Sequence, residues 1–96
     1  MKKFVFLFIG FTPPTPEIMQ SWMQWFKSVE SKAADRGNML GHGKEVTKNG
    51  IKDLPMDLNA VTGYMVFNAD SIDEAEKIAQ GCPMITSLKI YEVMSQ

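Results

Sequence analysis

The chain has 96 residues, of which 45% are hydrophobic and 22% charged, and its formal net charge is −1 at pH 7. This length predicts one domain, spanning residues 1–96, with no room for a second core. The lysines and arginines are scattered among acids, which argues against nucleic acid as a partner because phosphate binding requires clustered basic residues. No apolar run approaches the roughly 20 residues of a membrane-spanning helix, so the sequence predicts no membrane partner.

The counts of cysteine and histidine restrict the possible sites. The chain has one cysteine, Cys82, and one histidine, His42. A single cysteine excludes an intrachain disulfide and a cysteine-rich metal site, so we expect no metal, no cofactor and a reducing, cytoplasmic location. The basic start followed by an apolar run imitates a signal peptide, but residues 10–14 contain no small-x-small cleavage site. Secretion is therefore the less favoured alternative.

Residues 4–9, Phe-Val-Phe-Leu-Phe-Ile, are predicted to form the strand around which the fold is built. Alternation places Phe4, Phe6 and Phe8 on one face and Val5, Leu7 and Ile9 on the other. A strand that is apolar on both faces must be covered on both faces.

A proline-rich loop leads to a predicted helix from residue 16 to about residue 36. Thr15 is the expected N-cap and Pro16 suits the first helical position, while Gly37 is the expected left-handed residue after the helix. An apolar stripe at helical spacing predicts the buried face: Ile18, Trp22, Trp25, Phe26, Val29 and Ala33. Both tryptophans are thus interpreted as core residues, with a ligand-stacking role for one of them as the alternative.

The middle of the chain predicts weaker elements. Residues 39–47 are interpreted as an edge strand or a strand beside a cleft, because of their glycines and charges. Asn49-Gly50 is a strong hairpin-turn signal. Residues 51–60 are expected to return as a short irregular strand or a loop, since Pro55 forbids a regular central strand.

The last third predicts a strand, a helix and a strand. Residues 61–68 form a second strand that is apolar on both faces. Ser71 and Glu74 have the spacing of a capping box at a helix start, and Gly81-Cys82-Pro83 ends that helix. Residues 88–93 alternate more clearly, which indicates a strand nearer an edge.

This order of elements predicts an α+β fold, a ferredoxin-like βαββαβ sandwich with strands 4–9 and 64–68 in the centre of the sheet. The helices would cover one sheet face and leave an apolar face bare, which is a liability in a monomer. We therefore expect a homodimer through the open sheet face. The alternative is that the loop of residues 48–60 folds across that face.

Several motifs in the second half resemble the YCII-related and DGPF-domain family. They are Gly63-Tyr64 opening a hydrophobic strand, residues 69–75 (Ala-Asp-Ser-Ile-Asp-Glu-Ala), Gly81-Cys82-Pro83 and residues 90–93 (Ile-Tyr-Glu-Val). The resemblance covers residues 61–94 well and the first half more loosely. It implies a ferredoxin-like subunit, a homodimer whose sheets form a dimeric α/β barrel, and a pocket between sheet and helices. It implies no settled reaction.

This chain departs from the family pattern at two places. The Asp-Gly-Pro-Phe motif is represented only by an acid and a proline within residues 52–57. No histidine lies between residues 16 and 36, so the His–Asp pair credited to the family is not carried over.

The remaining chemistry centres on His42. Histidine exchanges a proton readily near neutral pH, and the flanking glycines leave space beside it. Asp53 or Asp57, across the predicted hairpin, is positioned to orient it as a catalytic acid or base. The alternative is an exposed edge histidine without a role. Cys82 follows a helix end and is interpreted as a packing residue.

Three functions follow from these residues. The first is a dimer that binds a small apolar or amphipathic molecule in a pocket lined by Phe6, Trp22, Lys44, Tyr64 and Met65, with His42 at the rim. The second is a cofactor-free enzyme that uses His42 and Asp53. The third is a structural or regulatory interaction module without a ligand.

Overall fold

The computed structural model describes residues 1–94 and shows an α+β fold. Its strands are β1 (Lys2–Ile9), β2 (Ala33–Met39), β3 (Gly43–Thr47), β4 (Gly50–Leu54), β5 (Val61–Ala69) and β6 (Ser87–Glu92), and its α-helices are α1 (Pro16–Val29) and α2 (Ile72–Gln80). Four strands form an antiparallel sheet in the order β2-β5-β1-β6, and β3 and β4 form a separate hairpin. The predicted central positions of the first strand and the strand from residue 61 are confirmed, as is the edge position of the last strand.

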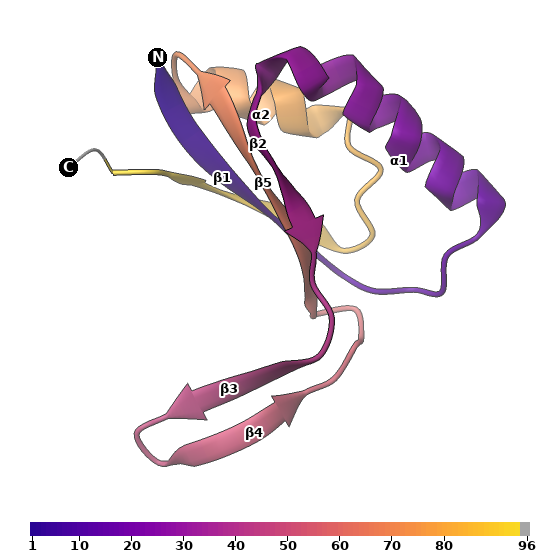
Figure 1. Cartoon of the computed structure of the whole chain (residues 1–96), viewed down its shortest axis with the longest axis vertical. Helices are drawn as coiled ribbons and strands as arrows, with labels where there is room; N and C mark the ends of the chain where they lie inside the picture. Colours follow the sequence, from indigo (N-terminus) through magenta and orange to yellow (C-terminus); the bar gives the residue numbers. More distant parts are fainter. Residues whose placement is uncertain (95–96) are drawn as a thin grey trace.

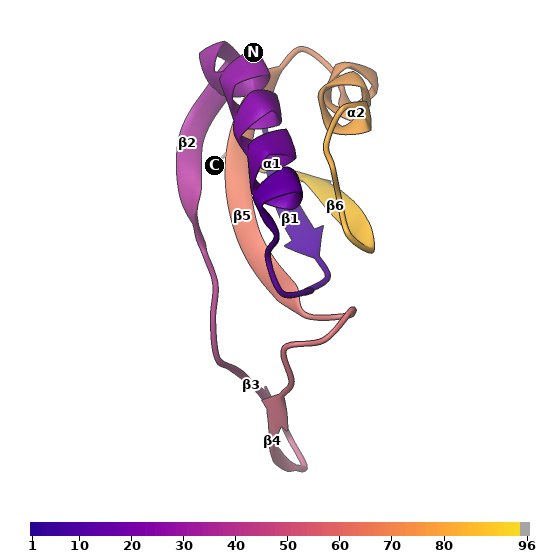
Figure 2. The ribbon, with the colours of Figure 1, turned by 90° about the vertical axis from the view of Figure 1, so that its right-hand side faces the viewer.

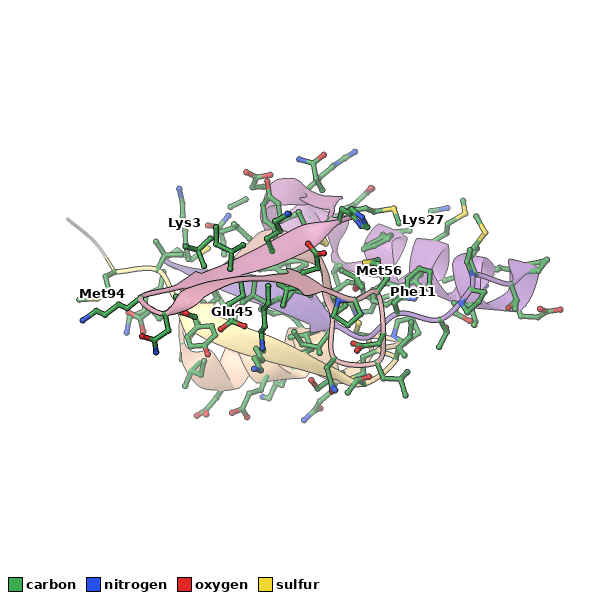
Figure 3. The ribbon with its side chains drawn as sticks, turned by 90° about the horizontal axis from the view of Figure 1, so that it is seen from below. Lys3, Phe11, Lys27, Glu45, Met56 and Met94 are labelled. Atoms are coloured by element: carbon green, nitrogen blue, oxygen red, sulfur yellow. The ribbon has the colours of Figure 1, made fainter. Side chains whose placement is uncertain are left out.

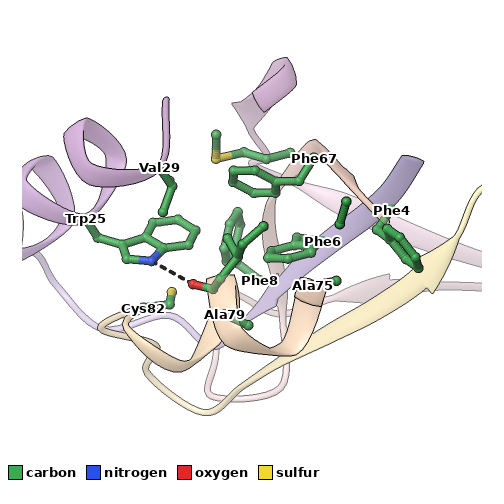
Figure 4. Close-up of a cluster of buried hydrophobic side chains, with 12 residues drawn as sticks. Phe4, Phe6, Phe8, Trp25, Val29, Phe67, Ala75, Ala79 and Cys82 are labelled. Atoms are coloured by element: carbon green, nitrogen blue, oxygen red, sulfur yellow. Dashed lines mark hydrogen bonds between the residues drawn. The ribbon is translucent and has the colours of Figure 1, made fainter. Parts of the chain in front are cut away.

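Both helices lie on one face of the sheet (Figures 1 and 2). Phe4, Phe6 and Phe8 of β1 point to this side and are at most 8% exposed. They pack with Trp25 of α1, whose indole N–H donates to the carbonyl of Ile78 on α2 at 3.2 Å (Figure 4). Because each indole or phenyl ring removes a large apolar surface from water, this aromatic layer ties the two helices to the sheet.

The opposite face carries no helix, and we call it the open sheet face. It is formed by Val5, Leu7, Tyr64 and Val66 of the central strands and by Tyr91 of β6, which share this face by strand register. The first four are half-buried and Tyr91 is 56% exposed.

The predicted helix over residues 16–36 is confirmed for residues 16–29 and wrong in its last third, residues 30–36. Helix α1 ends at Val29, a short 3₁₀ turn occupies Glu30–Lys32, and the chain then enters β2. Gly37 is accordingly not a helix cap. It lies within β2, with φ +64°, where the pairing of β2 with β5 shifts register between Asp35 and Asn38. Pairing with β5 satisfies the backbone of this segment, so the tertiary contact overrides its helix propensity.

The predicted strand over residues 39–47 is confirmed only for Gly43–Thr47, because β2 ends at Met39 and residues 40–42 separate it from β3. A hairpin turn is confirmed one residue earlier than predicted: Thr47 pairs with Gly50, so Lys48 and Asn49 form the turn, and the hairpin continues to Gly43 and Leu54. This hairpin projects from the sheet on the side away from the helices (Figures 1 and 2). Residues 48–60 therefore do not fold across the open sheet face.

Candidate ligand-binding hollow at the base of the hairpin

A hollow of about 410 Å³ lies where the hairpin joins the sheet. Its lining comes from both sides of the hairpin: Leu40, Gly41, His42, Gly43, Leu54, Pro55, Met56, Asp57, Asn59, Ala60 and Val61. Figure 3 shows this region from below, with Glu45 on the hairpin and Met56 in the loop after it. The volume falls within the range of about 300–1,000 Å³ that small-molecule pockets occupy. Most of the lining is apolar, so the hollow suits an apolar or amphipathic ligand.

Backbone hydrogen bonds hold the floor of the hollow. The carbonyl of Asp57 accepts from the N–H groups of Phe11 at 2.8 Å and Ala60 at 3.2 Å, and its carboxylate accepts from the Asn59 N–H at 2.9 Å. The Leu40 N–H donates to the carbonyl of Thr62 at 2.9 Å. These bonds fix both chain segments beside the hairpin to the sheet, so the hollow is built on ordered backbone.

His42 lies in this hollow, and Asp53 does not line it. His42 is exposed and occupies the bend before β3. The carboxylate of Asp53 lies 3.4 Å from the ammonium of Lys44, directly across the hairpin. Asp57 is the acid that shares the hollow with His42.

Of the five residues expected to line a pocket between sheet and helices, Phe6, Trp22 and Met65 meet in the core beneath the helices, whereas Lys44 and Tyr64 lie elsewhere. Phe6 and Met65 are core residues, 0% and 5% exposed. Trp22 packs edge-on against Phe8, with ring centroids 5.3 Å apart. Tyr64 belongs to the open sheet face, because adjacent residues of a strand point to opposite sides, and Lys44 lies on the hairpin.

Cys82 is unsuited to nucleophilic chemistry. It is a buried free thiol at the end of α2. Burial raises the pKa of this thiol from 9.0 to about 12, because desolvation disfavours the thiolate. The thiol therefore stays protonated near neutral pH, in agreement with its interpretation as a packing residue.

Two further features concern residues 1–94 as a whole. Within them, no group of three or more His, Cys, Asp or Glu side chains is arranged to hold a metal ion. No helix in this part of the chain is both long and apolar enough to cross a membrane.

The apolar residues of the hollow were not among the sequence candidates. Leu40 precedes the hairpin, Leu54 is the last residue of β4, and Pro55 and Met56 follow it. The sequence does contain a pattern that could have indicated these residues: apolar residues lie on both sides of a hairpin turn. Pairing of the two hairpin strands brings such residues together.

No family model, no curated protein and no solved structure matches this chain.

Proposed function

We propose that the chain is a small homodimeric protein of the YCII-related type that binds a small apolar or amphipathic molecule. The observation that carries this proposal is the largely apolar hollow of about 410 Å³ that contains the single histidine. The strand order β2-β5-β1-β6 with both helices on one face supports the ferredoxin-like subunit of that type. The single, buried cysteine supports a cytoplasmic location.

The ligand is assigned to the hollow and not to the layer between sheet and helices. That layer is filled by side chains: Phe4, Phe6 and Phe67 are 0% exposed and Trp25 is 5% exposed. A ligand there would have to displace well-packed aromatic rings, and such rings contribute strongly to stability, since truncating one in a core costs about 3–5 kcal/mol. The hollow is already formed and its lining is accessible.

The homodimer is supported by the open sheet face. Val5 and Val66 lie side by side on it, and Tyr91 follows on β6. Apolar and aromatic side chains that share one uncovered face favour association. Packing two such faces together gives each central strand a cover on its second side.

Binding is tested by isothermal titration calorimetry with dodecanoate, an amphipathic probe. We expect saturable binding to the wild-type protein and an affinity at least about tenfold lower in Leu40→Gln, because a polar side chain replaces part of the apolar lining. Leu58→Gln is the matched control, since Leu58 is 54% exposed and does not line the hollow. Absence of dodecanoate binding, or equal losses in the two variants, would contradict the proposal.

A cofactor-free enzyme is the second candidate, and the position of Asp57 in the same hollow as His42 favours it. In this case His42→Ala abolishes turnover of a substrate while the affinity for dodecanoate stays within about twofold of wild type. If the chain is instead an interaction module without a ligand, it should neither bind dodecanoate nor turn over a substrate.

A further inference from the structure

Within residues 1–94 of one chain, nothing covers the β3–β4 hairpin. Every residue of β3 and β4 is exposed except Gly43, which is half-buried. The hairpin projects from the sheet on the side of the open sheet face (Figure 1). A two-stranded hairpin on its own is marginally stable in water, so a hairpin of this kind is expected to be stabilised by a surface that it contacts.

The hairpin carries an exposed apolar cross-strand pair beside its turn. Val46 lies directly opposite Ile51, and the two side chains are 72% and 67% exposed. On the other face Glu45 pairs with Lys52 at 3.4 Å. The Lys44–Asp53 ion pair shares the face of Val46 and Ile51 nearer the base of the hairpin, so the exposed apolar pair occupies the part of this face next to the turn.

The open sheet face has the composition of a protein interface, against which the Val46–Ile51 pair could pack. Its centre is apolar and aromatic, whereas Asp35 and Lys89, which share this face by register, lie on the two edge strands. An apolar centre with a charged rim is the usual anatomy of a protein interface.

The total exposed area indicates how much surface remains to be covered. The chain exposes 7113 Å², whereas a compact monomer of 10.8 kDa exposes about 5,500 Å². Its radius of gyration is 14.4 Å, against about 12.5 Å for a compact domain of this length. The excess of about 1,600 Å² per chain matches what each subunit of an obligate homodimer buries, roughly 1,000–2,500 Å².

Symmetry favours a second copy over another partner. In a two-fold dimer each subunit gives one hairpin and receives one. A single symmetric contact would then cover both the Val46–Ile51 pair and the open sheet face. The net charge of −1 opposes such self-association only weakly.

We propose that the β3–β4 hairpin is an arm that lays its Val46–Ile51 pair on the open sheet face of a second copy. This inference rests on the proposed homodimer and specifies how it is held. Because the hollow containing His42 lies at the base of the arm, the arm places this hollow at the subunit boundary, where the second copy shields a bound ligand from water.

The test compares two double variants by sedimentation velocity over a range of concentrations. Val46→Glu with Ile51→Lys replaces the apolar pair by an opposite-charge pair in the same register as Lys44 and Asp53, so strand pairing is kept. Glu45→Gln with Lys52→Gln alters the neighbouring pair on the other face. Both variants keep the net charge of the chain, which makes the second a matched control.

We expect the wild-type protein to be a dimer and Val46→Glu/Ile51→Lys to raise the dimer dissociation constant at least about 100-fold, because four apolar side chains per dimer are lost. The control should stay within about threefold of wild type. A dimeric wild type with equal constants for the two variants overturns the arm and leaves the homodimer standing. A wild type that is monomeric at all concentrations overturns both.

Hydrogen exchange of the wild-type protein gives a second measurement that needs no variant. The peptide covering residues 43–54 should be protected above the dimer dissociation constant and lose that protection on dilution. Exchange in this peptide that is independent of concentration, in a protein that sedimentation shows to dissociate, contradicts the arm.

Discussion

At the scale of single residues, Gly37 allows β2 to lie close against β5. The carboxylate of Asp35 accepts from the Gly37 N–H at 2.7 Å, and the strand takes a left-handed step with φ +64°. A Cβ at this position would overlap the carbonyl oxygen of Tyr64. Only glycine satisfies both the backbone angle and the close approach, so this residue permits the register shift that connects α1 to the sheet.

Replacing Gly37 should therefore be costly. We expect Gly37→Ala to lower the free energy of unfolding by at least about 2 kcal/mol, since both strain and overlap oppose the new methyl group. Gly41→Ala is the control, because an added Cβ there meets no atom within 4 Å, and its effect should stay within about 0.5 kcal/mol. Urea unfolding monitored by tryptophan fluorescence measures both. Equal stabilities of the two variants would mean that the β2 register is not needed for folding.

At the scale of single elements, the helix starts are built by local hydrogen bonds. Thr15 accepts from the Ile18 N–H at 3.2 Å and Ser71 from the Glu74 N–H at 3.2 Å, as predicted for N-caps. The carboxylate of Glu74 accepts from the Asp70 N–H at 3.4 Å, one residue earlier than in a standard capping box. These interactions involve near neighbours in the chain, which is why the sequence indicates them.

The cap of α2 can be tested by one substitution. Ser71→Ala should reduce the free energy of unfolding by about 1 kcal/mol, because the Glu74 N–H loses its partner. Ser21→Ala removes a hydroxyl that donates to the Glu17 carbonyl within exposed α1, and it should change stability by less than about 0.5 kcal/mol. Thermal and urea unfolding give the difference. A Ser71→Ala protein as stable as Ser21→Ala would show that the cap does not stabilise α2.

The whole molecule combines a well-packed layer with an uncovered one. The helix side is closed by Phe6, Trp25 and Phe67, whereas the described part of the chain, residues 1–94, provides no cover for the open sheet face and the hairpin. A homodimer would make the stability of the fold depend on protein concentration, because association favours the folded state by mass action.

The homodimer can be tested by measuring the melting temperature, Tm, at several protein concentrations. For a homodimer, Tm should rise by about 3–6 °C for each tenfold increase in concentration. Val66→Lys, which puts a charge on the open sheet face, should remove this dependence. Met23→Lys, on α1 at a side chain that is 68% exposed, should retain it. A Tm of the wild-type protein that is independent of concentration would argue against the homodimer.

Local sequence patterns account for most of the elements and little of the site. The apolar strands, the two helix starts and the Asn49-Gly50 turn were predicted near their observed positions. His42 was a candidate and lies in the hollow, whereas Leu40, Leu54 and Met56 were missed. They were missed because residues 40 and 54–56 meet only once the hairpin has formed.

By itself, then, the sequence determined the features that depend on near neighbours: which strands are central, where each helix begins and where the hairpin turns. Tertiary structure decided where α1 ends and how β2 pairs. Residues 30–36 contain no local stop signal before Gly37, so pairing with β5, far along the chain, set that boundary. Contacts between distant segments also formed the hollow around His42, because packing between distant segments has no counterpart in short-range periodicity.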